Sequence, residues 1–291
     1  MATTPRKVVF PAAGFGTRLL PATTAFPKEL LPLVDRPIIQ YGVEEAVRAD
    51  MRQVILVTNP GNTMTAAHFE PHPELEALLG ERGKTELLAA VRALSAMVTI
   101  TTVHQPKPCG LGHAILVAKE SVGDEAFAVV LADDVIDADP PTLSRMCELY
   151  AELEGPVLLV ERVSHEAVGR YGVIDAEPIR DGVYRVRDLV EKPSPDHAPS
   201  DLAIVGRYVL TPDLFPALDQ TDKDAGGEIQ LTDGLRRLLQ KRPIYAYELR
   251  GIRYDVGNRL GLIQATLHFA LKRSDLGPQL REYLKTLKEQ A

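Results

Sequence analysis

The sequence predicts an α/β protein with a doubly wound, mixed but mostly parallel sheet flanked by helices. Four runs in the first half are apolar on consecutive residues, which is typical of strands that helices cover on both faces. They span 7–12, 53–58, 98–103 and 126–132, and helical segments separate them at 39–49, 84–95 and 111–120. This alternation favours right-handed βαβ units in an open sheet.

The second half of the chain begins at about residue 155 and has a different pattern. Strand-like segments follow one another closely there, which predicts a smaller and more antiparallel region. Helical patterns return at 212–218, 229–241 and 258–272, and an amphipathic helix runs from 278 to about 288. We therefore expect one domain over 1–291, with approximate sub-regions 1–155 and 156–272 and a C-terminal helical segment at 273–291.

The bulk composition excludes several classes of protein. The 291 residues are 45% hydrophobic with a net charge of −7, which argues against disorder and against a nucleic-acid binder with a basic face. No apolar run approaches the ~20 residues that span a bilayer, the N-terminal stretch lacks a secretory signal, and the two cysteines make no disulfide framework. We expect a cytoplasmic protein that binds neither nucleic acid nor membrane.

Gly14 and Gly16 follow the first apolar run and indicate a turn that exposes backbone N–H groups. Leu19 stands where a dinucleotide fingerprint needs a small residue, and Thr17–Arg18 stands where a Walker A loop needs lysine and a hydroxyl residue. Amide donors followed by a guanidinium suit a polyphosphate. From the glycines alone, a plain strand-to-helix turn with a surface arginine explains the stretch equally well.

The prolines that follow decide between these interpretations. They stand at 21, 27, 32 and 37 and forbid a regular helix, so the chain should continue as an extended loop. This loop carries Lys28 between two of the prolines, which favours a cation beside a reacting phosphate over a solvated charge. A second proline-rich stretch, at 191–201, predicts an ordered turn or lid.

The long pattern G-x-G-T-R-L-x-P-x-T followed by P-K-E-L-L-P-L-x-D-R-P resembles the signature of sugar-nucleotide pyrophosphorylases, and is most similar to bacterial UTP–glucose-1-phosphate uridylyltransferases. Further matching segments follow in order at 110–115, 129–134, 170–175, 190–193, 202–210, 226–233 and 254–261. The resemblance implies a Rossmann-like fold of the nucleotide-diphospho-sugar transferase type. It also implies Mg²⁺-assisted, in-line attack of glucose 1-phosphate on the α-phosphorus of UTP, giving UDP-glucose and pyrophosphate.

The resemblance implies the following site residues, with residues 1–155 binding the nucleotide and 156–272 the sugar phosphate. The nucleotide would contact Ala13, Gly14, Gly16, Thr17, Gln105 and Gly110. The sugar phosphate would contact Gly172, Glu191, Lys192, Val205 and Gly206, with Glu228 a further candidate. The catalytic cations would be Arg18, Lys28 and Lys192, and the metal ligands Asp133 and Asp255.

Some of these residues have simpler explanations. An Asp-Asp pair after a strand is usually a turn cap, and Asp134 competes with Asp133 for the metal. Asp133 is preferred because the family's first aspartate after "L-x" carries the metal. Glu191 and Lys192 alone could be a surface ion pair, and we expect an extended conformation for Lys192 because proline follows it. His113 is expected to be a helix-start residue rather than a catalyst.

The chain departs from the family pattern at Thr24, where lysine is common, and at Asp201, where asparagine is frequent. Three alternatives remain. The first is thymidylyl transfer or use of another sugar phosphate, since a pocket distinguishes thymine from uracil by one methyl group, which is worth only ~1–3 kcal/mol. The second is a non-catalytic regulatory subunit, which the intact set of charged residues disfavours, and the third is a dehydrogenase, which the glycine pattern contradicts. The family implies a homo-oligomer, dimer or tetramer. The C-terminal helix could supply its interface, or could fold back on its own domain.

Overall fold

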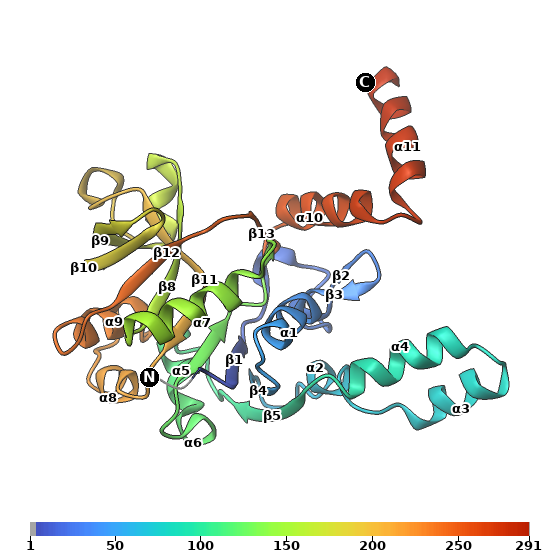
Figure 1. The fold of residues 1–291 in the computed structure, drawn as a ribbon, viewed down its shortest axis with the longest axis horizontal. Coiled ribbons are helices and arrows are strands. Elements are labelled where there is room, and N and C mark those ends of the chain that lie inside the picture. Colours follow the sequence, from blue (N-terminus) through green and yellow to red (C-terminus); the bar gives the residue numbers. More distant parts are fainter. Residues whose placement is uncertain (1–3, 291) are drawn as a thin grey trace.

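A nine-stranded mixed sheet runs through the molecule (Figure 1). The structure is a computed structural model that describes residues 4–290, so the ends of the predicted domain, at 1–3 and 291, lie outside the described residues. In sheet order the strands are β5 (Thr99–His104), β4 (Gln53–Thr58), β1 (Lys7–Ala12), β6 (Phe127–Val130), β11 (Leu202–Leu210), β8 (Val157–Arg162), β12 (Tyr245–Glu248), β10 (Val183–Glu191) and β9 (Gly172–Arg180).

Strand pairing changes character along this sheet. The first four strands are all parallel, with β1 between β4 and β6 and with β5 beside β4. From β11 onward the pairs are antiparallel except for β8 with β12. The predicted mixed α/β sheet is confirmed, with parallel pairing in the first half and mainly antiparallel pairing in the second. The predicted bounds of β1 and β4 match those observed.

The helices confirm most of the predicted segments, with ends shifted by one or two residues. They are α1 (Ile38–Arg48), α2 (Met64–Ala67), α3 (Pro73–Glu81), α4 (Thr85–Ser95), α5 (Leu111–Val117), α6 (Lys119–Val122), α7 (Thr142–Leu153), α8 (Leu214–Asp219), α9 (Leu231–Leu239), α10 (Arg259–Lys272) and α11 (Gly277–Gln290). The sequence did not predict α2, α3 or α7. The segment predicted as one helix at 111–120 is two short helices, α5 and α6.

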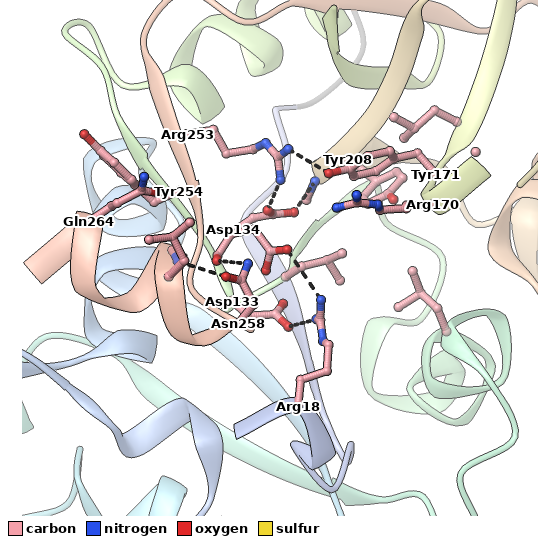
Figure 2. A pocket seen from close by; sticks show the side chains of 18 of the residues that line it. Arg18, Asp133, Asp134, Arg170, Tyr171, Tyr208, Arg253, Tyr254, Asn258 and Gln264 are labelled. Carbon is pink, nitrogen blue, oxygen red and sulfur yellow. Dashed lines mark hydrogen bonds and ion pairs between the residues drawn. The ribbon is translucent and has the colours of Figure 1, made fainter. Parts of the chain in front are cut away.

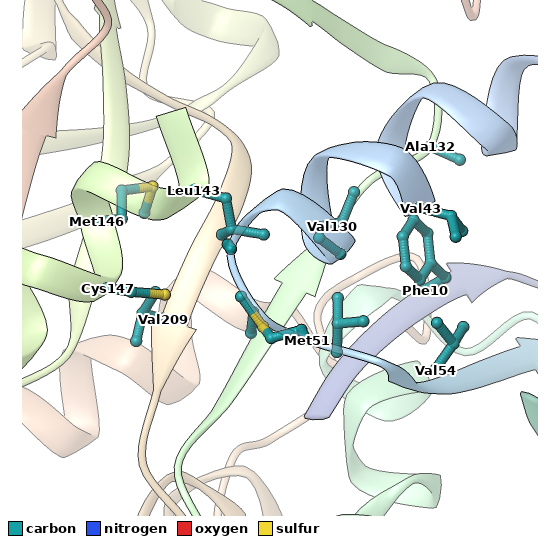
Figure 3. Close-up of a cluster of buried hydrophobic side chains, with 14 of the residues drawn as sticks. Phe10, Val43, Met51, Val54, Val130, Ala132, Leu143, Met146, Cys147 and Val209 are labelled. Atoms are coloured by element: carbon teal, nitrogen blue, oxygen red, sulfur yellow. The ribbon is translucent and has the colours of Figure 1, made fainter. Parts of the chain in front are cut away.

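Helices cover the sheet on both faces, which explains the consecutive apolar residues of its strands. On one face, Phe10 of β1 packs in a buried cluster with Val43 of α1 and Met146 of α7 (Figure 3). On the other face, Val9 of β1 packs in a second cluster with residues of α5, α8 and α9. Successive side chains of a strand point to opposite faces, so a strand covered on both sides is apolar throughout.

The loop after β1 contains no α-helix before α1, as its prolines predict. It is less extended than expected, because it forms two 3₁₀ turns, η1 (Thr17–Leu19) and η2 (Lys28–Leu30). A short hairpin of β2 (Pro32–Leu33) and β3 (Arg36–Pro37) then leads into α1. Gly16 has φ 61°, a left-handed conformation that glycine adopts readily, and it starts the first turn.

The proline-rich stretch at 191–201 is an ordered turn with one 3₁₀ helix, η4 (Pro195–His197). The expectation of an extended Lys192 was wrong, because this residue has φ 45°, in the left-handed region. Its backbone N–H donates to the carbonyl of Tyr171 at 2.9 Å. This tertiary hydrogen bond accompanies a conformation that the local preference before proline does not predict.

Within residues 4–290, no helix is long and apolar enough to cross a membrane.

Candidate active site

A cavity of about 1160 Å³ opens at the carboxyl end of β6 and brings distant segments together (Figure 2). In a doubly wound sheet, ligands bind outside the carboxyl ends of the parallel strands. The predicted residues that line this cavity come from every part of the chain: Arg18, Asp133, Gly172, Glu191, Gly206 and Asp255. The structure therefore gathers in one place residues that the sequence assigned to phosphate, metal and sugar.

Four charged side chains form the centre of the site. Lys28 Nζ, at the start of η2, donates to Asp133 Oδ2 at 2.6 Å. Arg18 Nη1 lies 3.4 Å from Asp255 Oδ2, and Arg18 Nη2 lies 3.8 Å from Asp133 Oδ2. Asp255 reaches Asp133 because β7 (Asp134–Asp137) and β13 (Ile252–Asp255) form a two-stranded antiparallel sheet in which Asp255 lies opposite Asp134.

The charges of Lys28 and Asp133 sustain each other. Burial alone would raise the pKa of Asp133, but the charge and the hydrogen bond of Lys28 outweigh it and the pKa is lowered. Burial likewise tends to lower the pKa of Lys28, but the charges of Asp133 and Glu29 and the hydrogen bond to Asp133 together outweigh it, and the pKa is raised. Both groups are therefore ionised at neutral pH, and an ionised carboxylate is what a hard cation requires.

The space between the two carboxylates depends on Gly257. A Cβ at this position would lie 2.9 Å from Asp133 Oδ2, 3.1 Å from Asp255 Oδ1 and 2.6 Å from Arg18 Nη2. Across residues 4–290, no three His, Cys, Asp or Glu side chains gather in a way that could hold a metal alone. Mg²⁺ typically takes one or two carboxylates and completes its shell with phosphate oxygens and water. The pair Asp133 and Asp255 fits a cation of that kind.

Asp134 is turned away from this pair and supports the cavity wall instead. Its Oδ2 accepts the backbone N–H of Gly206 at 3.0 Å, and its Oδ1 accepts from Arg253 (Figure 2). Arg253 also donates to Glu161 at 2.7 Å and to the Tyr171 hydroxyl at 3.2 Å. The sequence did not indicate Arg253, although it directly precedes the matching segment 254–261, because a largely buried arginine has no pattern of its own.

The residues assigned to the nucleotide lie in two loops. Gly14 and Thr17 are exposed at the glycine turn, whereas Ala13 is buried. Gln105 is buried, and its Nε2 donates to the Gly110 carbonyl at 3.2 Å and lies 2.9 Å from His113 Nδ1.

Gly110 starts α5 with φ 93°, and a Cβ there would lie 2.7 Å from the carbonyl of Ile229, so only glycine fits. Its neighbour Leu111 lines the large cavity. The turn between Gln105 and α5 is thus held rigidly at the edge of the site.

The residues assigned to the sugar phosphate are only partly brought together. A Cβ at Gly172 would lie 2.5 Å from Thr232 Oγ1 and 3.3 Å from Glu191 Oε2, so the side chains of Thr232 and Glu191 lie close to the Gly172 backbone. Val205 is buried in the core and does not line the cavity, whereas its neighbours Ile204 and Gly206 do. Lys192 lines a smaller neighbouring cavity, with its half-exposed ammonium 3.2 Å from Glu191 Oε1.

The remaining predicted contacts and departures lie near the site without entering its charged centre. Glu228 Oε2 accepts from Gln230 Nε2 at 3.1 Å. Thr24 Oγ1 donates to the Pro21 carbonyl at 2.9 Å, which closes its own turn. Asp201 pairs with Arg162 at 2.7 Å, so the aspartate is used locally. These two departures leave the four central charges unchanged.

Comparison with known proteins agrees with this geometry. Residues 7–271 match the nucleotidyl transferase family. The chain belongs to this family. A nucleotidyl transferase named UTP–glucose-1-phosphate uridylyltransferase 2, from Staphylococcus saprophyticus, is 46% identical over 283 residues, covering 97% of this chain and 98% of the relative. One from Bacillus subtilis, named UTP–glucose-1-phosphate uridylyltransferase, is 45% identical over 282 residues, covering 97% of each chain.

Solved nucleotidyl transferase structures share the fold as well. A UDP-glucose pyrophosphorylase complexed with UDP-glucose superimposes with a TM-score of 0.84 at 40% identity, covering 92% of this chain and 100% of the other. A UTP-bound enzyme of the same kind from Acinetobacter baumannii gives a TM-score of 0.89 at 38% identity, covering 96% and 98%.

Proposed function

We propose that this nucleotidyl transferase is a UTP–glucose-1-phosphate uridylyltransferase. It transfers the uridylyl group of UTP to α-D-glucose 1-phosphate and releases pyrophosphate. The observation that carries the proposal is that Arg18, Asp133 and Asp255 line a cavity together with Glu191, and that Lys28 donates to Asp133 at its edge. The names of full-length relatives at 45–46% identity and the UTP and UDP-glucose complexes of similar structures support the same substrates.

The reaction needs charge stabilisation and positioning more than covalent chemistry. The attacking oxygen of glucose 1-phosphate is already ionised, so no strong base is required. Lys28 is held rigidly and largely buried between prolines, and we assign it to the α-phosphate, where negative charge builds up in the transition state. The amides of Gly16 and Thr17 and the guanidinium of Arg18 hold the outer phosphates, and the backbone around Ala13 and Gly14 lies against the base and ribose.

The metal and the sugar occupy opposite sides of this centre. Asp133 and Asp255 would hold Mg²⁺, which when bound draws the phosphate oxygens together and offsets their charge. Glu191 and the backbones of Gly172, Val205 and Gly206 bind the glucose ring. Lys192 leaves its ion pair with Glu191 to meet the sugar phosphate, a movement that its half-exposed position permits.

The turn from Gln105 to Gly110, together with Ala13, reads the uracil edge. Its rigid hydrogen bonding favours a fixed base plane. Because thymine differs from uracil by one methyl group, discrimination by packing is worth only ~1–3 kcal/mol, and partial use of dTTP is expected.

The organisation of the chain is proposed in the same terms. The nine-stranded sheet, which joins both halves, supports one domain with a nucleotide-binding sub-region at 1–155 and a sugar-phosphate-binding sub-region at 156–272. Exposed apolar residues on the last two helices, Leu260 and Ile263 of α10 and Tyr283 and Leu287 of α11, support a homo-oligomer. A cytoplasmic location stays a prediction.

The test is pyrophosphate release from glucose 1-phosphate with Mg²⁺ and each of UTP, dTTP, ATP, GTP and CTP. We expect a clear preference for UTP, and a fall of about 10²–10³-fold in kcat for Lys28→Ala. Lys84→Ala, which removes an exposed lysine outside the site, is the matched control and should leave the rate unchanged. A strong preference for dTTP would move the chain to thymidylyl transfer. Tight UTP binding without release from any pair would favour a regulatory subunit.

A further inference from the structure

Strand β11 is irregular where it passes the cavity. It pairs with β8 at Leu202–Ile204 and again from Tyr208, and the register shifts between these two stretches. Four steps along β11, from Ile204 to Tyr208, lie opposite two steps along β8, from Val160 to Leu158. The two additional residues bend the strand, and Gly206 at the bend lines the cavity. Irregularities of this kind commonly re-aim a strand beside a functional site.

Arg207 stabilises this bend although it does not itself line the cavity. Its side chain is 1% exposed, and its Nη1 donates to the carbonyl of Gly206 at 2.9 Å and to that of Leu131 at 3.2 Å. The backbone N–H of Leu131 donates to the same Gly206 carbonyl at 2.9 Å. Leu131 stands two residues before Asp133. One guanidinium therefore fixes both the glycine on the sugar side and the strand end that leads to the proposed metal ligand.

Glu45 of α1 completes this support. Its Oε2 accepts from Arg207 Nε at 2.9 Å and from Nη2 at 2.8 Å, and its Oε1 accepts the backbone N–H of Leu143 in α7 at 3.1 Å. Glu45 is 4% exposed, and neither it nor Arg207 lines the cavity. The pair is buried with its hydrogen bonds made, and it joins α1, α7, β6 and β11.

Stability alone is a weak reason for such a pair. Taking two charges out of water is so costly that replacing a buried ion pair with apolar residues of similar volume is often neutral or stabilising. What apolar residues cannot supply is a donor that bridges the carbonyls of Leu131 and Gly206.

We propose that Arg207 and Glu45 are positioning residues for the sugar subsite: the guanidinium sets the Gly206 backbone against the Asp133 segment, and the carboxylate sets the guanidinium. This inference rests on the proposed function, because it takes Gly206 to bind the glucosyl group. It predicts that, when binding is measured without Mg²⁺ so that the Asp133 carboxylate holds no metal, the pair matters to the sugar and not to the uridine nucleotide. Arg18, on the nucleotide side of the cavity, pairs with Asp255 and Asp133 instead of with either of them.

The test separates these contributions with two ligands that differ only in the sugar. Dissociation constants for UDP and for UDP-glucose are measured by calorimetry on the full chain, as wild type and as Arg207→Met/Glu45→Leu. We expect UDP affinity to stay within about twofold of wild type and UDP-glucose affinity to fall at least about tenfold. KM for glucose 1-phosphate should rise by a similar factor. The reason is that a binding group displaced from its correct position loses about tenfold or more in affinity. Thermal unfolding by circular dichroism checks that the variant is folded.

Two comparisons keep the result decisive. Arg180→Gln/Glu152→Gln removes a surface ion pair and should change neither constant. Should the double variant fail to fold, Arg207→Lys is measured instead, because its ammonium keeps the charge but cannot reproduce the four hydrogen bonds that the guanidinium makes to Glu45 and the two carbonyls. Unchanged UDP-glucose affinity in the folded variant, or equal losses for both ligands, overturns the inference. A wild-type chain that binds neither ligand overturns the proposed function itself.

Discussion

Glu29 is a buried carboxylate whose charge should weaken the fold near neutral pH. Its side chain is 2% exposed, and within residues 4–290 neither carboxylate oxygen has a hydrogen-bond partner. The ammonium of Lys28 lies 4.0 Å from Oε1, too far for a hydrogen bond. Burial raises the pKa of Glu29 from its usual 4.5 to about 7, although the charge of Lys28 opposes the shift.

The direction of the effect follows from proton binding. The folded pKa, about 7, exceeds the unfolded value of 4.5, so the folded chain holds this proton more tightly. The resulting stabilisation is complete below pH 4.5 and is lost as the pH rises through 7. At 1.36 kcal/mol for each pH unit, the difference is about 3 kcal/mol. Glutamine cannot ionise, so Glu29→Gln should match the wild type near pH 4.5 and exceed its free energy of unfolding by up to about 3 kcal/mol at pH 8.

Urea unfolding followed by circular dichroism, at intervals from pH 5 to pH 8, measures this difference. Glu70→Gln, which neutralises an exposed glutamate, is the control and should show no comparable trend. A stability difference between Glu29→Gln and wild type that does not grow with pH would refute the reasoning. So would a variant that is less stable than wild type throughout the range.

Two further substitutions test the metal site and the core. Gly257→Ala places a methyl group within 3.1 Å of both proposed metal ligands. The Mg²⁺ concentration for half-maximal activity should therefore rise about 10- to 100-fold. An unchanged Mg²⁺ requirement would show that the cation binds elsewhere. Phe215→Ala removes a buried ring stacked on Phe127 with centroids 5.4 Å apart, and should lower the free energy of unfolding in urea by about 3–5 kcal/mol; a loss below 1 kcal/mol would mean that the core refills the cavity.

The pattern of apolar residues was enough to locate the strands that helices cover on both faces of the sheet, and the helices that pack against those faces. The bounds of β1 and β4 could be read from the sequence because every residue there except Lys7, Pro11, Gln53 and Thr58 is a buried hydrophobic residue. The same signal is absent from α3, in which no described residue is buried. It is also absent from the two-stranded sheet of β7 and β13, whose aspartates interrupt any apolar alternation. Yet this small sheet is the element that brings Asp255 to Asp133.

The contacts between distant residues could not be predicted. Arg207 and Glu45 are 162 positions apart, and their sequence surroundings are those of ordinary strand and helix residues. Arg253 and Asp134 are 119 positions apart. Single-sequence patterns describe neighbours along the chain, whereas these pairs depend on which strands become adjacent in the sheet. The resemblance to a family indicated which residues touch the substrates, but not which residues hold them in place.

The hairpin of α3 and α4 projects from the body of the molecule (Figure 1), and within the described chain no residue of either helix is buried. Local opening costs little where few apolar groups leave water, and the opening units of a protein often coincide with such supersecondary motifs. The free energy of local unfolding therefore differs along the chain: residues 73–95 can unfold and refold while the nine-stranded sheet stays intact. A protease would reach its first cut in this hairpin long before the strands that carry the site were exposed.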